Sequence, residues 1–320
     1  MARVFFAKGA RGEIVRRMQV RLTDLGFDTQ GTDGVFGQDT ATAVQAFQRD
    51  QRLGATGEVD DITYQKLMGT AVPPAQDRAL GITAQFEGHG FTLAQGNFDG
   101  AGITWGIIGF TLSGGELEQL LSEIEPDLVR QAFGAKTDQL LGVLKLPMKQ
   151  QIAFADSISL GTSKAKLAEP WRSAFRKLGE FPEVQEIQIR HVDEDYLQPA
   201  RQTMQDFGLT TELGLALAFD VHVQNGGIKA TAREQIRKDR DAHPVGAERD
   251  LRVIIANAVA DKSSPAFRQD VRDRKLTLAT GAGRVHGEMF VLRNWGLDDF
   301  PAGQDGASAG DFPPQLHKQP

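Results

Sequence analysis

Two adjacent prolines, Pro73 and Pro74, constrain the fold of this chain more than any other local feature. Proline has no amide hydrogen and a fixed φ angle, so a proline pair among small residues predicts a semi-rigid linker. We expect the linker to span residues 70–78, between a small domain at residues 1–69 and a larger one at residues 79–298. The length of 320 residues suits two ordinary domains. Residues 299–320 lack hydrophobic periodicity and are expected to form a disordered tail.

Three short helices are predicted in the first domain, because apolar residues recur there at intervals of three and four. These residues are Val15, Met18, Leu22 and Leu25 in the first helix, Ala43, Val44 and Phe47 in the second, and Tyr64 and Leu67 in the third. Asp39 or Thr40 is expected to cap the second helix, and Asp60 or Asp61 to begin the third. The first domain is therefore expected to be a three-helix bundle.

The larger domain is predicted to be mainly α. Leu117, Leu120, Leu121 and Ile124 follow helical spacing, and residues 213–219 are apolar on nearly every face, which is typical of a buried central helix. Between Gly90 and Phe110, six glycines interrupt β-branched and aromatic residues, which indicates a small hairpin or a loop-and-strand excursion.

Composition excludes several classes of function. The net charge of -6 gives no basic footprint for a nucleic-acid partner, and no apolar run approaches the ~20 residues of a membrane span. The chain has no cysteine, and its six histidines lack metal-binding spacing, so no metal or other cofactor is expected. The first eight residues are too short and too soon charged for a signal peptide, so we expect synthesis in the cytoplasm without a leader.

Two carboxylates have the context of a catalytic pair. Glu87 follows Leu80 and Ala84 on one helical face, where burial raises a carboxyl pKa and favours a general acid. Asp99 lies in a glycine-flanked turn that leaves its carboxylate in a more polar setting. One buried and one solvated acid suit the hydrolysis of a glycosidic bond. From the residues alone, a solvated helix-terminal Glu and a simple Asp-Gly turn remain the alternatives.

The run from Asp99 to Phe110, Asp-Gly-Ala-Gly-Ile-Thr-Trp-Gly-Ile-Ile-Gly-Phe, resembles the active-site segment of the glycoside hydrolase family 46 chitosanases. These enzymes belong to the lysozyme-like superfamily, so the resemblance implies an α+β lysozyme-like catalytic domain. It implies that Glu87 is the general acid, that Asp99 is the general base, and that Thr104 helps to hold the attacking water. The two acids are closer in sequence than is usual in the family, which leaves the stereochemical outcome open.

A second part of the chain is similar to the same family. The segment from Leu215 to Asp220, followed by the loop at residues 225–229, resembles the family's buried helix and glycine loop, with Asn225 where a histidine is common. Arg274, Lys275 and Arg284 stand where the family supplies cations that pair with acids behind the cleft. Asp220 is expected to be one of their partners, and ordinary surface ion pairs are the alternative.

The first domain resembles the peptidoglycan-binding domain 1 family. The resemblance rests on four motifs spread over nearly the whole segment, at residues 15–27, 33–37, 40–48 and 57–63. Most of the motif residues form turns or the core, so it implies the module but no particular ligand contacts. Such a module is expected to dock on the cell wall and to raise the local substrate concentration.

Together these features predict a modular cell-wall lytic enzyme that resembles the endolysins of bacteriophages of Gram-negative hosts. We expect a monomeric muramidase that cleaves peptidoglycan strands between N-acetylmuramic acid and N-acetylglucosamine. It would reach the periplasmic wall through a holin or a secretion machine, as a phage lysis protein or an antibacterial toxin. The alternatives are a wall-anchored chitosanase, a lytic transglycosylase that needs only Glu87, and a non-enzymatic wall-binding protein.

Overall fold

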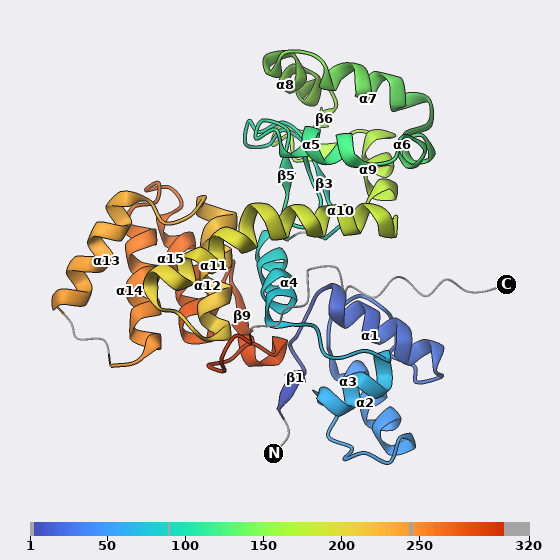
Figure 1. The fold of residues 1–320 in the computed structure, drawn as a ribbon. Coiled ribbons are helices and arrows are strands. Elements are labelled where there is room, and N and C mark those ends of the chain that lie inside the picture. Colours follow the sequence, from blue (N-terminus) through green and yellow to red (C-terminus); the bar gives the residue numbers. More distant parts are fainter. Residues whose placement is uncertain (1–2, 89, 243–245, 304–320) are drawn as a thin grey trace. The chain divides into compact units, whose positions relative to one another are not determined.

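The computed structural model describes residues 3–88, 90–242 and 246–303. These residues form two compact units (Figure 1). Unit 1 contains residues 3–86 and 194–303, and unit 2 contains residues 87–193, so the second unit is inserted into the sequence of the first. The structure is mainly α-helical with short strands, which confirms the predicted fold class. The predicted linear domain boundaries stay a prediction.

The N-terminal module within unit 1 contains the three predicted helices, α1 (Glu13–Asp24), α2 (Gln38–Asp50) and α3 (Asp61–Met68). Helix α3 begins at Asp61, one of the two predicted positions, and Asp60 caps it, since the Asp60 carboxylate accepts a hydrogen bond from the amide of Thr63 at 2.8 Å. The cap predicted for α2 is wrong, because this helix begins at Gln38 after Gly37 and has no side-chain cap. A strand that the sequence did not predict, β1 (Val4–Phe6), pairs antiparallel with β2 (Val59–Asp60).

Two buried glutamines hold the turns of this module. The side-chain amide of Gln19 donates to the carbonyl of Val35 at 3.0 Å and accepts from the amide of Gly34 at 2.7 Å. Gln48 in the same way donates to a carbonyl, that of Glu58 at 2.7 Å, and accepts from the amide of Gly57 at 2.9 Å. Each glutamine therefore satisfies the backbone of one glycine turn, and both glycines have positive φ.

The N-terminal module is bonded to the later part of unit 1. The indole of Trp295 donates to the carbonyl of Arg11 at 3.0 Å, and the amide of Ala7 donates to the carbonyl of Asn294 at 3.3 Å. Arg3 also forms an ion pair with Glu212. The predicted linker is shorter than expected, because α4 (Ala75–Glu87) begins inside it, directly after the two prolines. Proline suits the beginning of a helix, where its missing amide hydrogen costs nothing.

The rest of unit 1 is a group of helices followed by a hairpin (Figure 1). In chain order these are η2 (Asp193–Leu197, a π-helical turn whose first residue belongs to unit 2), α11 (Gln198–Phe207), α12 (Glu212–Asn225), α13 (Ala230–Ala242), α14 (Glu248–Asp261), α15 (Arg268–Thr280), β8 (Ala282–Val285), β9 (Glu288–Val291) and η3 (Leu292–Trp295). Helix α12 is buried from Glu212 to Val221, which confirms the predicted central helix.

Unit 2 combines short helices with one small antiparallel sheet. The helices are α5 (Glu116–Glu123), α6 (Pro126–Phe133), η1 (Gly134–Lys136), α7 (Thr137–Leu144), α8 (Met148–Ser157), α9 (Trp171–Leu178) and α10 (Pro182–Val192). The strands are β3 (Ala94–Gln95), β4 (Thr104–Trp105), β5 (Phe110–Thr111), β6 (Ser159–Leu160) and β7 (Lys166–Leu167), in the order β5-β4-β3-β7-β6. The predicted excursion at residues 90–110 is therefore three strands of a five-stranded sheet.

The start of the predicted tail is ordered. Asp299 pairs with the buried guanidinium of Arg252 at 2.5 Å, and the amide of Ala302 donates to the carbonyl of Thr210 at 2.8 Å. Disorder therefore does not begin at residue 299, and residues 304–320 lie outside the described part of the chain. Within the described part, no helix has the length and apolar character that crossing a membrane requires.

Candidate active site

Glu87 is the last residue of α4 and is half-buried. Leu80 and Ala84, about two turns and one turn before it, are buried as the sequence pattern predicted. Phe86 fixes the end of the helix, because its ring packs against Phe290 with the centroids 4.9 Å apart. Gly88 then adopts a positive φ of 68° and ends the helix, so the backbone at Glu87 is set by packed residues on one side and by a turn on the other.

Asp99 lies in the loop between β3 and β4 and is exposed, as expected for the more polar acid. Its carboxylate accepts one hydrogen bond from the amide of Ala101 at 2.9 Å. Gly100 and Gly102 have φ angles of 89° and 86°, which glycine adopts without strain. A Cβ atom at Gly102 would lie 2.9 Å from Ile152, so this position also needs glycine for space. The loop can therefore bring a carboxylate to the surface on a tightly packed backbone.

Asn97 anchors the Asp99 loop, a role that the sequence did not reveal. Its side-chain amide donates to Asp156 of α8 at 2.7 Å and accepts from the amide of Gly102 at 2.7 Å. Its backbone amide donates to the hydroxyl of Ser159 at 2.9 Å. The partners in α8 and β6 lie about 60 residues further along the chain, so only the fold brings them together.

Thr104 is the first residue of β4, and only 5% of its surface is exposed. Its hydroxyl is buried and has no hydrogen-bond partner among the described residues. The next residue, Trp105, is fully buried and donates its indole N–H to the carbonyl of Phe175 at 2.9 Å, which holds the strand. A buried hydroxyl without a partner is rare in proteins and indicates a place for a water or a ligand atom.

The three predicted site residues therefore all belong to unit 2, and Asp99 and Thr104 share one short strand connection. They supply a half-buried carboxyl, an exposed carboxylate and an unpartnered hydroxyl. An acid to protonate a leaving group, a base to activate a water, and a group to hold that water are what glycoside hydrolysis requires.

Asp220 forms the ion-pair network that the resemblance implied. Its carboxylate accepts hydrogen bonds from Arg274 at 2.6 Å, from Lys275 at 2.5 Å and from Thr83 of α4 at 3.0 Å. Burial alone would raise the pKa of Asp220, but the charges and hydrogen bonds of the two cations lower it to about 2. The guanidinium of Arg284 does not contact Asp220 but donates a hydrogen bond to the carbonyl of Gly287 in its own hairpin.

His222 bonds to the hydroxyl of Thr203 at 2.9 Å, and burial lowers the pKa of its ring. His89 lies outside the described residues. In the described ranges, no three His, Asp or Glu side chains gather as a metal site would need.

Comparisons with known proteins relate both parts of the chain to families. The peptidoglycan binding domain family matches residues 11–67, and glycosyl hydrolase family 46 matches residues 84–250. A chitosanase of Gynuella sunshinyii bound to chitotetraose is a similar solved structure, with 20% identity and a TM-score of 0.45 over 69% of this chain and 98% of that chain.

A native chitosanase of Bacillus subtilis MY002 is similar at 18% identity and a TM-score of 0.44, over 68% of this chain and 97% of that one. Because the family 46 match spans more than half of the 320 residues, the chain belongs to glycosyl hydrolase family 46, with a peptidoglycan-binding module at its N-terminus.

Proposed function

We propose that this glycoside hydrolase is a muramidase that cleaves peptidoglycan strands between N-acetylmuramic acid and N-acetylglucosamine. The observation that carries the proposal is the union, in one chain, of a peptidoglycan-binding module at residues 11–67 with a family 46 hydrolase domain. A wall-binding module keeps the enzyme at the wall and raises the effective concentration of wall glycan at the active site. Such a module would give little advantage to an enzyme whose polymer lies elsewhere.

In the proposed mechanism, Glu87 protonates the glycosidic oxygen as the bond to the leaving sugar breaks. Asp99 removes a proton from a water that attacks the anomeric carbon, and the hydroxyl of Thr104 holds this water. The exposure of Asp99 keeps its carboxylate open to solvent, from which the water comes. The orphan hydroxyl of Thr104 supports this assignment, because a bound water would satisfy it.

A chitosanase is the second candidate. The chain belongs to family 46, and the two similar solved structures described above are chitosanases. Chitosan is a polycation, so its binding favours clefts lined by acids. Phe98, which is 49% exposed beside Asp99, instead offers an apolar face to a sugar ring. Ile103 and Trp105 are buried and do not bear on this choice. Phe98 therefore favours the more neutral, acetylated glycan.

The site of action follows from the same proposal. The module would hold the enzyme on the periplasmic wall, and a holin or a secretion machine would release it there. Peptidoglycan strands are then the partner, with no nucleic acid or membrane involved, and one monomer contains every proposed catalytic group.

The test is the digestion of purified peptidoglycan and of chitosan by the full-length protein, with mass spectrometry of the products. We expect sugars with reducing-end muramic acid from peptidoglycan, and a slower reaction with chitosan. Faster cleavage of chitosan would favour the second candidate, and 1,6-anhydro sugars would identify a transglycosylase. No cleavage of either polymer would support a structural wall-binding protein.

Two variants assign the residues. Glu87→Gln should lower the rate about 100- to 10,000-fold, the usual contribution of general acid catalysis. Asp99→Asn should also remove most of the activity in a hydrolase, whereas a transglycosylase would keep it. Glu118→Gln on α5 changes an exposed acid in the same unit and serves as the control that keeps full activity. Nearly normal turnover by a folded Glu87→Gln variant would disprove the assignment.

A further inference from the structure

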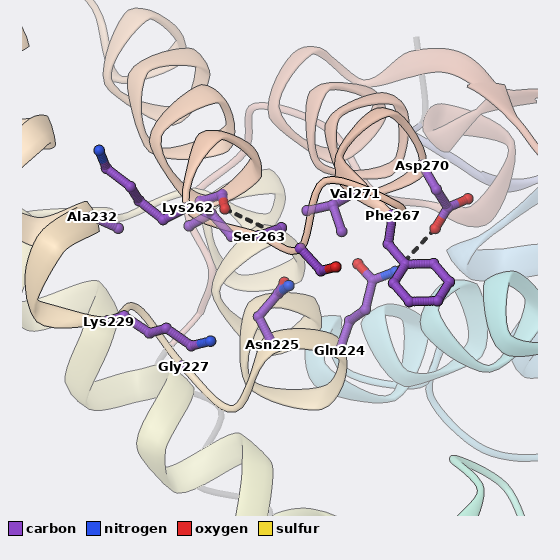
Figure 2. A pocket seen from close by; sticks show the side chains of 12 residues that line it. Gln224, Asn225, Gly227, Lys229, Ala232, Lys262, Ser263, Phe267, Asp270 and Val271 are labelled. Atoms are coloured by element: carbon purple, nitrogen blue, oxygen red, sulfur yellow. Dashed lines mark hydrogen bonds between the residues drawn. The ribbon is translucent and has the colours of Figure 1, made fainter. Parts of the chain in front are cut away.

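A cavity of about 270 Å³ lies where α12 ends, α13 begins, and the loop joins α14 to α15 (Figure 2). It belongs entirely to unit 1 and contains none of the three proposed catalytic residues. The volume lies just below the usual range for ligand sites, about 300–1,000 Å³, so the cavity suits one sugar substituent or a short peptide.

The cavity wall carries two lysines that form no ion pair with the described residues. The side chains of Lys229 and Lys262 are exposed, and neither ammonium group forms a hydrogen bond or an ion pair within the described ranges. Figure 2 shows Lys229 extending toward Asn225, whereas the side chain of Lys262 extends away from Asn225 at the edge of the cavity. The charge of Lys262 helps to lower the pKa of Glu234, but the Glu234 carboxylate is already paired with Lys238 at 2.8 Å. The two lysines therefore remain available for an external anion.

The remaining acid of the cavity wall is occupied. Asp270 accepts a hydrogen bond from Gln224 at 3.2 Å and contacts the ring of His286 at 2.8 Å. The wall also has an unmet acceptor, because the side-chain oxygen of Asn225 is buried and has no partner among the described residues. Phe267 is 66% exposed at the same cavity. The lining therefore offers cations for a carboxylate, an acceptor for an N–H or O–H group, and an apolar face.

A chain of contacts within unit 1 links this cavity to the end of α4, the helix before the proposed catalytic acid. The ring of Phe86, which precedes Glu87, lies 5.2 Å from the guanidinium of Arg274, and Arg274 binds Asp220. Lys275 binds the same carboxylate and also donates to Gln224 of the cavity wall at 2.7 Å. The cavity wall is therefore part of the rigid network that fixes the helix before Glu87.

We infer that this cavity binds a carboxylate carried by the glycan substrate, with Lys229 as the main ligand and Lys262 as the second. The inference rests on the proposed function, since peptidoglycan has such carboxylates on its stem peptides and, where a stem peptide has been removed, on the lactyl group of muramic acid. Chitosan and chitin have none, and chitosan would place further positive charge beside the lysines. The cavity would thus select acidic wall glycan, while the unmet oxygen of Asn225 accepts from an amide or a hydroxyl of the same ligand.

The test measures binding by the full-length Glu87→Gln protein, so that hydrolysis does not interfere. Three probes are titrated in a calorimeter: a peptide-free tetrasaccharide of alternating N-acetylglucosamine and muramic acid, the same sugar with L-alanyl-D-glutamate on its lactyl groups, and the N-acetylglucosamine tetramer. We expect both acidic probes to bind about tenfold more tightly than the neutral tetramer at low salt, and this preference to shrink as salt rises. If the first probe binds more tightly than the second, the ligand is the lactyl carboxylate. If the second binds more tightly, the ligand is a stem-peptide carboxylate.

The lysine variants decide whether this cavity is responsible. Lys229→Gln combined with Lys262→Gln should abolish the tenfold preference, and Lys229→Gln alone should remove most of it. Arg249→Gln is the matched control, because Arg249 is an exposed cation near the opposite end of α14 and should leave the preference intact. An unchanged preference in the double variant would overturn the inference, even where muramic products establish the muramidase. If the double variant loses the preference but the protein cleaves only chitosan, the inference about the cavity stands and the proposed function alone is refuted.

Discussion

Replacing Asp220 by Asn tests the network behind the proposed catalytic helix. Asp220 and Lys275 are fully buried and Arg274 is nearly so, and the carboxylate is the acid that both cations share. Removing one partner of a buried ion pair leaves uncompensated charge and costs about 3–5 kcal/mol. In a unit of about 200 residues, this loss lowers the melting temperature by roughly 6–20 °C.

The assay is thermal unfolding of the wild-type protein and two matched variants, followed by circular dichroism at pH 7. Asp206→Asn is the control, because Asp206 forms a partly exposed pair with Arg233 and its loss should cost at most about 1 kcal/mol. A second variant adds Lys275→Met to Asp220→Asn and should recover part of the lost stability, since one uncompensated cation is then removed. Equal melting temperatures for Asp220→Asn and Asp206→Asn would refute the reasoning.

The same residue predicts a dependence on pH. The pKa of Asp220 is lowered from its ordinary value of 3.8 to about 2, so folding favours the ionised form. Its contribution to stability is therefore fully present above pH 3.8 and is lost as the pH falls toward 2. Acid titration of the unfolding free energy should show this loss in the wild-type protein and not in Asp220→Asn.

Two further predictions follow. Thr104→Val should lower kcat about tenfold or more while leaving the melting temperature unchanged or higher, because it removes a buried hydroxyl that has no protein partner; an unchanged kcat with a lower melting temperature would show a purely structural role. A chain that begins at residue 70 should lose about 3 kcal/mol of stability, because it lacks three contacts worth about 1 kcal/mol each. These are the contacts of Arg3 with Glu212, Arg11 with Trp295 and Ala7 with Asn294. Calorimetry of this shortened chain would contradict the prediction if the remaining part melted at the full-length temperature.

The sequence predicted the features that depend on neighbouring residues. Helical periodicity placed Glu87 at the end of a buried stripe, and the glycine-rich turn placed Asp99 on an exposed loop next to the sheet. The cap of α2 was predicted wrongly because Thr40 is buried and bonds to Gln19, from another helix. Local preference for a capping residue was overridden by this tertiary contact.

Features that join distant segments could not be predicted. Asn97 meets Asp156 across about 60 residues, and no spacing rule connects an asparagine with an acid so far away. The cavity beside Lys229 and Lys262 could not be predicted, because it forms only when α12, α13 and the loop after α14 come together. The order at Asp299 was missed for the same reason, since its partner Arg252 lies in α14.

The insertion of unit 2 into unit 1 has a consequence for synthesis on the ribosome. The first part of unit 1 ends at residue 86, and its second part begins at residue 194. At about 5–20 residues per second, the intervening hundred or so residues take roughly 5–20 s to be made. Throughout this interval Arg78 has been translated, but Glu212, with which it pairs in the folded protein, has not. Unit 2 is complete in sequence before unit 1, so a nascent chain can fold the inserted unit first and complete the outer unit only after its second part has been made.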